Sequence, residues 1–336
     1  MNLIDQHGRA FTYARLAFVD QCNLRCTYCM PESGLKWISK KTSWQTAEIQ
    51  TLLRYLNLWG ITKIRFTGGE PLIRSDFQEI MDFANLLNFQ QVTITTNGTY
   101  IQNFQETFLK KQITKTNVSL DSLSPDRFLE ITKRNQWSKV WENINWLDQN
   151  KLPFRINTVL LASTSALELK DMFQCALENG WEWCFIEEMP FNGQGTQPNQ
   201  IWNQENFEKT LTSIGIPFSK EPLRSGDTAQ YYHFEKGARI GFIAAWSRTF
   251  CGTCNRLRIT PEGNLHYCLY SEKPFDILNK IRSGESDNDI RVALQDFLSN
   301  KPLSGFDSEL ENKNSLPSMA KLLSTASESS RVSAFS

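Results

Sequence analysis

The chain has 336 residues, of which 40% are hydrophobic and 21% charged, so a sizeable buried core is expected and wholesale disorder is excluded. Lysine plus arginine and aspartate plus glutamate both number 36, so no global field gathers nucleic acid or anionic lipid and any basic site must be local. No apolar run approaches the ~18 residues of a membrane helix, and the first residues do not resemble a signal peptide, so we expect a soluble, cytoplasmic protein that binds neither nucleic acid nor membrane.

Strand-like runs alternate with helical patterns over the first two-thirds of the chain. The expected strands are residues 14–19, 62–66, 92–96, 116–120, 154–160 and 183–187. One helical pattern is closed by Gly60, and a second opens with Ser75 and Gln78 in the spacing of a capping box. This alternation predicts a parallel α/β sheet, either open or curled into part of a barrel.

After about residue 190 the alternation stops. Later strands are expected at 239–246 and 256–260, a hairpin turn at 261–264 with a return strand through 265–269, and helices near 275–282 and 287–299. We therefore divide the chain into a first domain, 1–230, a C-terminal region, 231–314, and a tail, 315–336. Eight of the 22 residues of the tail are serine, so we expect it to be mobile.

Three cysteines follow the first expected strand in the pattern Cys22-x3-Cys26-x2-Cys29. In a long chain without a signal peptide, grouped cysteines favour metal or redox chemistry over disulfides. Three thiolates on one loop can hold three irons of a [4Fe–4S] cluster and leave the fourth iron without a protein ligand. Structural zinc is the alternative, although it prefers four ligands.

Polar motifs also end the next three expected strands. Gly68-Gly69-Glu70-Pro71 follows the second strand, and the segments 95–98 and 119–122 close the third and fourth. Glycines let backbone groups approach a ligand, and the Glu70 carboxylate can accept hydrogen bonds from an ammonium group. Each motif alone could be an ordinary turn. At consecutive carboxyl ends of parallel strands, they predict one site.

The cysteine pattern after the first strand, together with Gly-Gly-Glu-Pro after the second, resembles the radical S-adenosylmethionine (SAM) enzymes. The resemblance implies a partial (β/α)6, TIM-like barrel in which SAM is cleaved to a 5′-deoxyadenosyl radical that abstracts hydrogen from a substrate. It assigns Cys22, Cys26 and Cys29 to the first cluster. The residues that it places on the SAM side are Tyr28, Gly69, Glu70, Ser119 and Met189.

A second group consists of Cys251, Cys254 and Cys268. A zinc site with His266 as the fourth ligand is the alternative to a cluster, although His266 and Cys268 are expected on one strand face, where they would crowd one corner. Arg256 and Arg258 alternate on one strand face, where two guanidinium groups can clamp phosphates. Their alternative is two exposed strand arginines.

Residues 250–270 resemble one branch of these enzymes, the GTP 3′,8-cyclases (the MoaA family), which are lyases, and the resemblance extends over about residues 15–270. It implies conversion of GTP to 3′,8-cyclo-7,8-dihydro-GTP, the first step of molybdenum cofactor (molybdopterin) biosynthesis. It further implies a second [4Fe–4S] cluster on the C-terminal extension, a homodimer, a reductase or flavodoxin-type electron donor, and a downstream cyclic pyranopterin monophosphate synthase. The residues that it assigns to GTP are Arg15, Arg65, Thr95, Arg155, Arg256, Leu257 and Arg258, of which Arg256 and Arg258 count with the first three cysteines as catalytic.

This sequence departs from the family pattern at three places. Cys184 stands where the family usually has Arg, and Arg155 where it usually has Lys. The family ends in Gly-Gly, whereas no glycine follows Gly305 here. Lys63 can assist the arginines, but a solvated lysine is the expected role. Two other functions stay open: a radical SAM enzyme with an auxiliary cluster acting on another substrate such as a peptide, and a catalytically impaired homologue that retains clusters or zinc.

Overall fold

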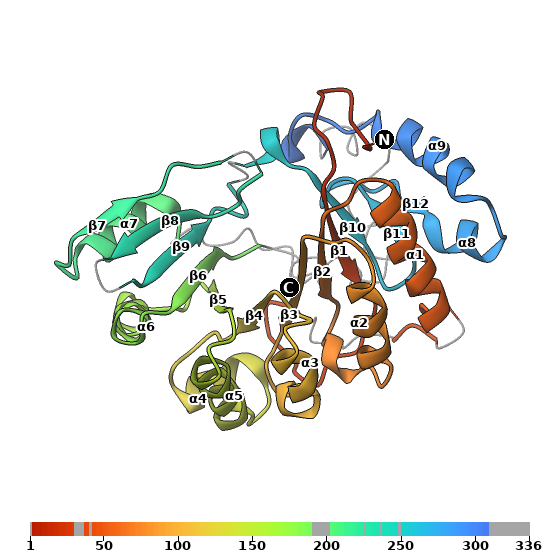
Figure 1. Ribbon diagram of the computed structural model, residues 1–336. Coiled ribbons are helices and arrows are strands. Elements are labelled where there is room, and N and C mark those ends of the chain that lie inside the picture. The colour runs from red at the N-terminus through yellow and green to blue at the C-terminus, as the bar shows by residue number, and fades with distance from the viewer. Residues whose placement is uncertain are drawn as a thin grey trace.

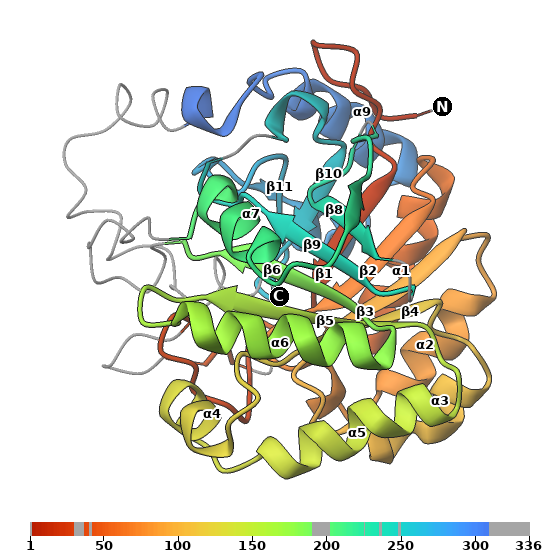
Figure 2. The ribbon, with the colours of Figure 1, turned by 90° about the vertical axis from the view of Figure 1, so that its left-hand side faces the viewer.

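The computed structural model describes residues 2–29, 37–39, 42–189, 202–224, 226–234, 237–247 and 250–308. Six parallel strands lie side by side in chain order: β1 (Tyr13–Ala17), β2 (Lys63–Thr67), β3 (Gln91–Thr96), β4 (Lys115–Ser119), β5 (Phe154–Leu160) and β6 (Glu182–Glu187). They confirm the six predicted strands. The sheet curves into a barrel that does not close (Figures 1 and 2).

Helices cover the outer face of this curved sheet: α1 (Thr46–Leu58), α2 (Phe77–Asn85), α3 (Gln105–Leu109), α4 (Pro125–Thr132), α5 (Trp137–Gln149) and α6 (Ala166–Asn179) (Figure 1). Short 3-10 helices are Pro71–Ile73, Ile101–Phe104 and Cys251–Thr253. The predicted capping box of Ser75 and Gln78 is wrong. The N-cap of α2 is Asp76, and the Asp76 carboxylate pairs with Arg74 at 2.6 Å, so the helix begins one residue later than the motif suggests.

The chain after α6 extends both edges of the same sheet. Beside β6 lie β9 (Arg239–Ile243), β8 (Gln230–Phe234) and β7 (Phe218–Lys220), with α7 (Gln204–Thr212) nearby; beside β1 lie β10 (Arg256–Ile259), β11 (Asn264–His266) and β12 (Phe275–Asp276). Strand β9 runs parallel to β6 and β10 parallel to β1, whereas β8 is antiparallel to β9 and β11 antiparallel to β10. The predicted hairpin is therefore confirmed. Helices α8 (Ile277–Arg282) and α9 (Asp287–Leu298) follow, and the tail 315–336 lies outside the described residues.

The two faces of the sheet differ in chemistry because strand side chains alternate. On β1, Ala14 and Leu16 are fully buried in the core under the helices, whereas Tyr13 and Arg15 line the concave face. The apolar core thus lies between sheet and helices, and the interior of the barrel is polar. None of the helices in the described part of the chain is long and apolar enough to cross a membrane.

Candidate active site

The two cysteine groups lie at opposite ends of the parallel strands: one where the strands end and the other where they begin. Below, the edge of the sheet means one of these two rows of strand ends. Cys22 and Cys26 follow β1, at the edge where the parallel strands end. Cys251 and Cys254 precede β10, which begins level with Tyr13, the first residue of β1. Cys268 follows β11, which runs antiparallel to β10 and so returns to the same edge. The space inside the barrel therefore separates two groups of three thiols.

The thiols of Cys22, Cys26 and Cys29 are free, partly buried neighbours. Burial raises the pKa of Cys22 to about 11; it also raises the pKa of Cys26, to which the nearby thiolates of Cys29 and Cys22 add. Cys22 Sγ accepts hydrogen bonds from the Leu24 amide (3.4 Å) and the Asn97 side chain (3.7 Å). The described residues hold no group of three His, Cys, Asp or Glu side chains arranged around a single metal ion. Three free thiols of one loop are, however, the donor set of an iron–sulfur cluster with one open iron.

The first cysteine loop rests directly on the Gly68-Gly69-Glu70 segment. The Gly69 and Glu70 amides donate to the carbonyls of Val19 (2.7 Å) and Gln21 (2.8 Å). A Cβ on Gly69 would lie 2.3 Å from the Gln21 carbonyl oxygen, a backbone atom that cannot turn away as a side chain can. In this structure the glycine therefore makes room for the cysteine loop.

Substituting Gly69 with alanine is expected to destabilise the protein by about 1–3 kcal/mol, the usual cost of overpacking, and to lower the iron bound by the first cysteine group. Gly252→Ala is the matched control, since a Cβ there meets no atom within 4 Å. Urea unfolding and iron analysis check both variants. Equal midpoints for the two would contradict this account of Gly69.

Two buried carboxylates brace the same edge. Glu70 is fully buried and accepts from the Asn97 amide (2.7 Å), the Thr96 hydroxyl (2.7 Å) and the Leu72 amide (3.0 Å). Its burial raises its pKa to about 7. Tyr28, from within the cysteine loop, donates to Asp121 at 2.8 Å, beyond the end of β4. Three of the ~four acceptor positions of the Glu70 carboxylate are thus used inside the chain, so its visible role is to hold the loop after β3 against the cysteine loop.

The other residues assigned to the SAM side are separated. Ser119 is the last residue of β4, at the edge of the first cysteine group. Met189 lines a small cavity of about 70 Å³ that Cys251, Cys254 and Cys268 also line. The sequence did not show that Met189 borders the cavity of the second group.

Electrostatics distinguish the second group from the first. Burial raises the pKa of Cys254, but the cations Arg256, Lys301 and Arg258 outweigh it and hold the pKa well below its ordinary value.

The argument that His266 and Cys268 share a strand face is wrong, because β11 ends at His266. The ring of His266 lies 3.2 Å from the carbonyl oxygen of Ser271, to which its Nδ1–H can donate.

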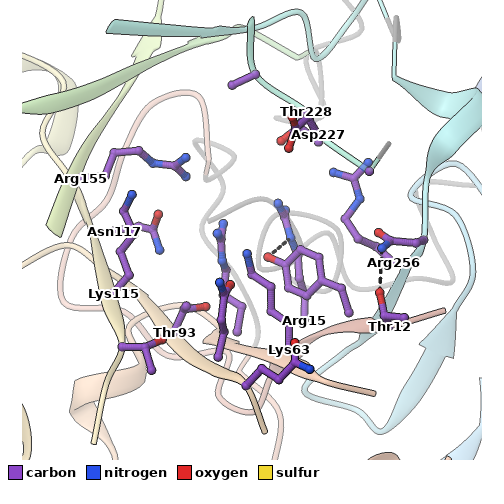
Figure 3. A pocket seen from close by; sticks show the side chains of 18 of the residues that line it. Thr12, Arg15, Lys63, Thr93, Lys115, Asn117, Arg155, Asp227, Thr228 and Arg256 are labelled. Carbon is purple, nitrogen blue, oxygen red and sulfur yellow. Dashed lines mark hydrogen bonds between the residues drawn. The ribbon is translucent and has the colours of Figure 1, made fainter. Parts of the chain in front are cut away.

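A cavity of about 630 Å³ opens where the strands begin. Its cationic lining residues are Arg15, Lys63, Arg65, Lys115, Arg155, Arg239 and Arg256, and its carboxylates are Glu182 and Asp227. The labelled side chains of Arg15, Lys63, Arg155 and Arg256 reach from separate strands around one space (Figure 3). Among the described residues, seven cations against two carboxylates make this local site strongly positive in a chain without net charge.

Tyr13 lies among three of these cations. Arg15, Lys63 and Arg65 lie 5.7, 4.9 and 5.6 Å from the centre of its ring, and Arg15 Nε donates to its hydroxyl at 3.2 Å. Burial raises the pKa of Tyr13, but the three cations outweigh it, and the pKa falls to about 7. The interpretation of Lys63 as a solvated lysine is wrong, since Lys63 is half-buried against this ring.

Most but not all of the residues assigned to GTP meet at this cavity. Arg15, Arg65, Arg155 and Arg256 line it, and Arg258 lines the cavity of the second cysteines. Thr95 is buried on β3 with a hydroxyl that has no hydrogen-bond partner in the structure. The side chain of Leu257 packs in the core on the other face of β10, so only its backbone can face a ligand. The motifs did not indicate Tyr13, Lys115 or Arg239. Tyr13 lies two residues before Arg15 on β1, and Lys115 two residues before Asn117 on β4, so each shares a strand face with another residue of the cavity.

Cys184, the departure from the family pattern, lies in a small buried cluster with a tyrosine. Cys184 is fully buried and packs with Tyr231. Arg155 Nη1 donates to the Tyr231 hydroxyl at 2.6 Å, and the Arg239 guanidinium lies 3.5 Å from the Tyr231 ring centre. A Cβ on Gly241 would lie 2.6 Å from that ring. Small residues at 184 and 241 thus admit a tyrosine that holds Arg155 and Arg239.

Comparisons with known proteins agree with this architecture. Residues 16–176 match the family described as the radical SAM superfamily, and residues 181–306 match Molybdenum Cofactor Synthesis C. A GTP 3′,8-cyclase of Clostridium perfringens is 34% identical over 301 residues, covering 89% of this chain and 93% of the relative. Molybdenum cofactor biosynthesis protein 1 of Dictyostelium discoideum is 33% identical over 327 residues, 93% of this chain, which spans only 51% of that protein.

Among solved structures, SuiB of Streptococcus suis bound to S-adenosylmethionine has a TM-score of 0.65 at 15% sequence identity. The similarity covers 96% of this chain and 73% of SuiB. At this identity the similarity concerns the fold, and it confirms the predicted partial barrel.

Proposed function

The chain belongs to the family of radical SAM enzymes called GTP 3′,8-cyclases, and we propose that it binds GTP in the cationic cavity between its two cysteine groups. In this family the reaction is the first step of molybdenum cofactor biosynthesis; the proposed product is 3′,8-cyclo-7,8-dihydro-GTP, which makes the enzyme a lyase. The observation that carries the proposal is the cavity of about 630 Å³ with seven cations, next to three free cysteines. A tetra-anionic triphosphate in a protein without net charge needs such a local pocket.

Cys22, Cys26 and Cys29 would hold the cluster of the superfamily, and Cys251, Cys254 and Cys268 a second [4Fe–4S] cluster. Both donor sets fit: all six thiols are free, each set lies on one edge, and the second lines a cavity. When bound, the first cluster and SAM supply a 5′-deoxyadenosyl radical. The braces around Glu70 and Asp121 would keep the first cysteine loop fixed against the sheet.

Guanidinium groups are suited to the phosphates because each presents two parallel donors to an oxyanion. Arg65 Nε and Arg155 Nε, both buried, have no hydrogen-bond partner in the structure. Such donors are costly when unpaired, so a bound anion would stabilise the cavity. Tyr231 would orient Arg155 toward this anion, since it already accepts from Arg155 Nη1.

The proposal is tested by anaerobic turnover of the iron–sulfur-reconstituted protein with reductant, SAM and GTP, followed by mass spectrometry. Formation of 5′-deoxyadenosine is expected, together with a cyclised nucleotide that forms only when GTP is present. Deoxyadenosine that forms without a cyclised nucleotide would instead support another substrate, such as a peptide.

The proposed reaction of GTP needs an electron donor and a second enzyme that uses its product. An electron must come from a reductase or flavodoxin-type donor, and a cyclic pyranopterin monophosphate synthase would consume the product. The resemblance to the family supports these partners and a homodimer. The eight free cysteines are typical of a reducing compartment such as the cytoplasm.

A further inference from the structure

A buried lysine lies behind the second cysteine group. Lys301 follows α9, has only 3% of its surface exposed, and donates from Nζ to the Cys254 carbonyl at 2.7 Å. Its ammonium lies 4.7 Å from the ring centre of Phe11, which is itself fully buried. Lysine is almost never buried to this degree without a partner of opposite charge. In the described part of the chain no carboxylate forms an ion pair with Lys301.

Both cysteines and arginines act electrostatically on Lys301. Burial lowers the pKa of Lys301, and the cations Arg9 and Arg258 add to this effect, while the thiolates of Cys254 and Cys268 oppose it. Conversely, Lys301 is one of the three cations that lower the pKa of Cys254. Lysine and thiolates are thus within electrostatic reach of one another in a poorly solvated region, where screening is weak.

Arg9 binds the other end of the same cysteine loop but, unlike Lys301, forms an ion pair with a carboxylate within the described residues. Its Nη1 donates to the Cys251 carbonyl at 3.0 Å, and its Nε pairs with the buried Asp5 at 2.5 Å. Arg9 therefore has a carboxylate partner, whereas Lys301 has none in the described part of the chain. Arg9 also donates to the carbonyls of Pro302 and Leu303, which fixes the segment that carries Lys301.

Lys301 differs from Arg256 and Arg258 in one respect. The two arginines line the cavities, so a bound anion can approach them. Lys301 lines neither cavity. Its charge is therefore available to the cysteine group whether or not a substrate is bound.

We propose that Lys301 is a positioning residue of the second cysteine group, which holds the Cys254 carbonyl and supplies a fixed positive charge that makes a cluster bound there easier to reduce. This inference rests on the proposed second cluster. Reduction adds one electron to the cluster and no proton, so the negative charge increases by one. A nearby buried cation stabilises the more negative state, and charge is among the properties that set cluster potentials.

The test uses the full chain with Cys22, Cys26 and Cys29 replaced by alanine, so that only the second group can hold a cluster. The variants Lys301→Gln, Lys301→Met and Lys301→Arg are reconstituted anaerobically and titrated with dithionite, with the reduced cluster followed by electron paramagnetic resonance. Lys280→Met is the matched control, because Lys280 also lies near a phenylalanine ring but pairs with Glu285 at 2.9 Å.

We expect Lys301→Gln and Lys301→Met to shift the midpoint potential in the negative direction by about 59 mV or more, a tenfold change in the one-electron equilibrium. Lys301→Arg and Lys280→Met should keep the potential of the parent. If the Lys301→Gln and Lys301→Met variants lose the iron of the second group while Lys301→Arg retains it, the requirement for a cation is likewise supported.

An unchanged potential in Lys301→Gln at full iron content would overturn the inference, as would loss of iron in Lys301→Arg, which would indicate a requirement for shape. A parent without any cluster would overturn the proposed second cluster itself, and this inference with it. The iron content of the parent therefore separates the two failures.

Discussion

Cys22→Ala is expected to abolish the formation of 5′-deoxyadenosine from SAM and to remove the iron of one cluster. Cys22 is one of only three thiols on its loop, and a cluster held by three ligands has no spare protein ligand. Apart from Cys22, Cys26 and Cys29, no cysteine in the described residues lies on the loop after β1. Anaerobic incubation with dithionite and SAM, with deoxyadenosine measured by mass spectrometry, checks the prediction.

The control is Cys175→Ala, which removes a free, partly buried thiol from α6 on the outside of the barrel. This variant should form deoxyadenosine as the parent does. Cys251→Ala should also retain SAM cleavage, because its group lies at the opposite edge. Deoxyadenosine at the parental level in Cys22→Ala would show that the first cluster is held elsewhere.

The fold could be predicted well where the signals are local. The six parallel strands are short segments that alternate with helical patterns, and α6 has a capping box of Ser165 and Glu168 and ends at Gly180 in the left-handed conformation. The motif at Ser75 did not show that α2 has Asp76 as its N-cap, where the Asp76 carboxylate pairs with Arg74 and accepts from the Thr46 hydroxyl at 2.6 Å. Local patterns also could not show that β9 and β10 join opposite edges of the sheet.

The candidate site residues were predicted from sequence motifs, which indicate residue types and spacings but not contacts between distant parts of the chain. A metal or phosphate site needs particular residue types at particular spacings, so the motifs and the family resemblance brought out the six cysteines and four arginines of the cavity, but not Arg239. They did not reveal the roles of Gly69 or Lys301, which depend on contacts with Gln21 and Cys254 that are distant in sequence. The family resemblance assigned Leu257 to GTP, but strand alternation turns its side chain into the core.

The two ends of the cationic cavity differ, because a different cysteine group lies at each end of the parallel strands. The strands begin at the second group and end at the first, and the arginines of the cavity lie nearer to the second. A GTP molecule with its phosphates on these arginines would occupy the space between the two groups. The residues at the two edges can therefore be tested separately.

Arg256→Ala should weaken GTP binding by about 3 kcal/mol, or about a hundredfold, which is typical for loss of one partner of a buried charge pair. Arg256 is 2% exposed, lines both cavities, and has Nε and Nη2 atoms without hydrogen-bond partners in the structure. Arg258→Ala should weaken binding in the same direction. Both affinities can be measured by anaerobic calorimetry, with Arg282→Ala as the control, an arginine on α8 that pairs with Glu48.

SAM cleavage separates a binding defect from general damage. Because the first cysteine group lies at the opposite edge, Arg256→Ala should still form 5′-deoxyadenosine, but without the cyclised nucleotide. Arg256 also lowers the pKa of Cys254, so the iron of the second group must be measured in the same samples. Arg256→Lys keeps the charge without the two parallel donors, and it should restore the iron but only part of the affinity. If Arg256→Ala binds GTP as tightly as the parent, the triphosphate does not lie where the structure leads us to place it.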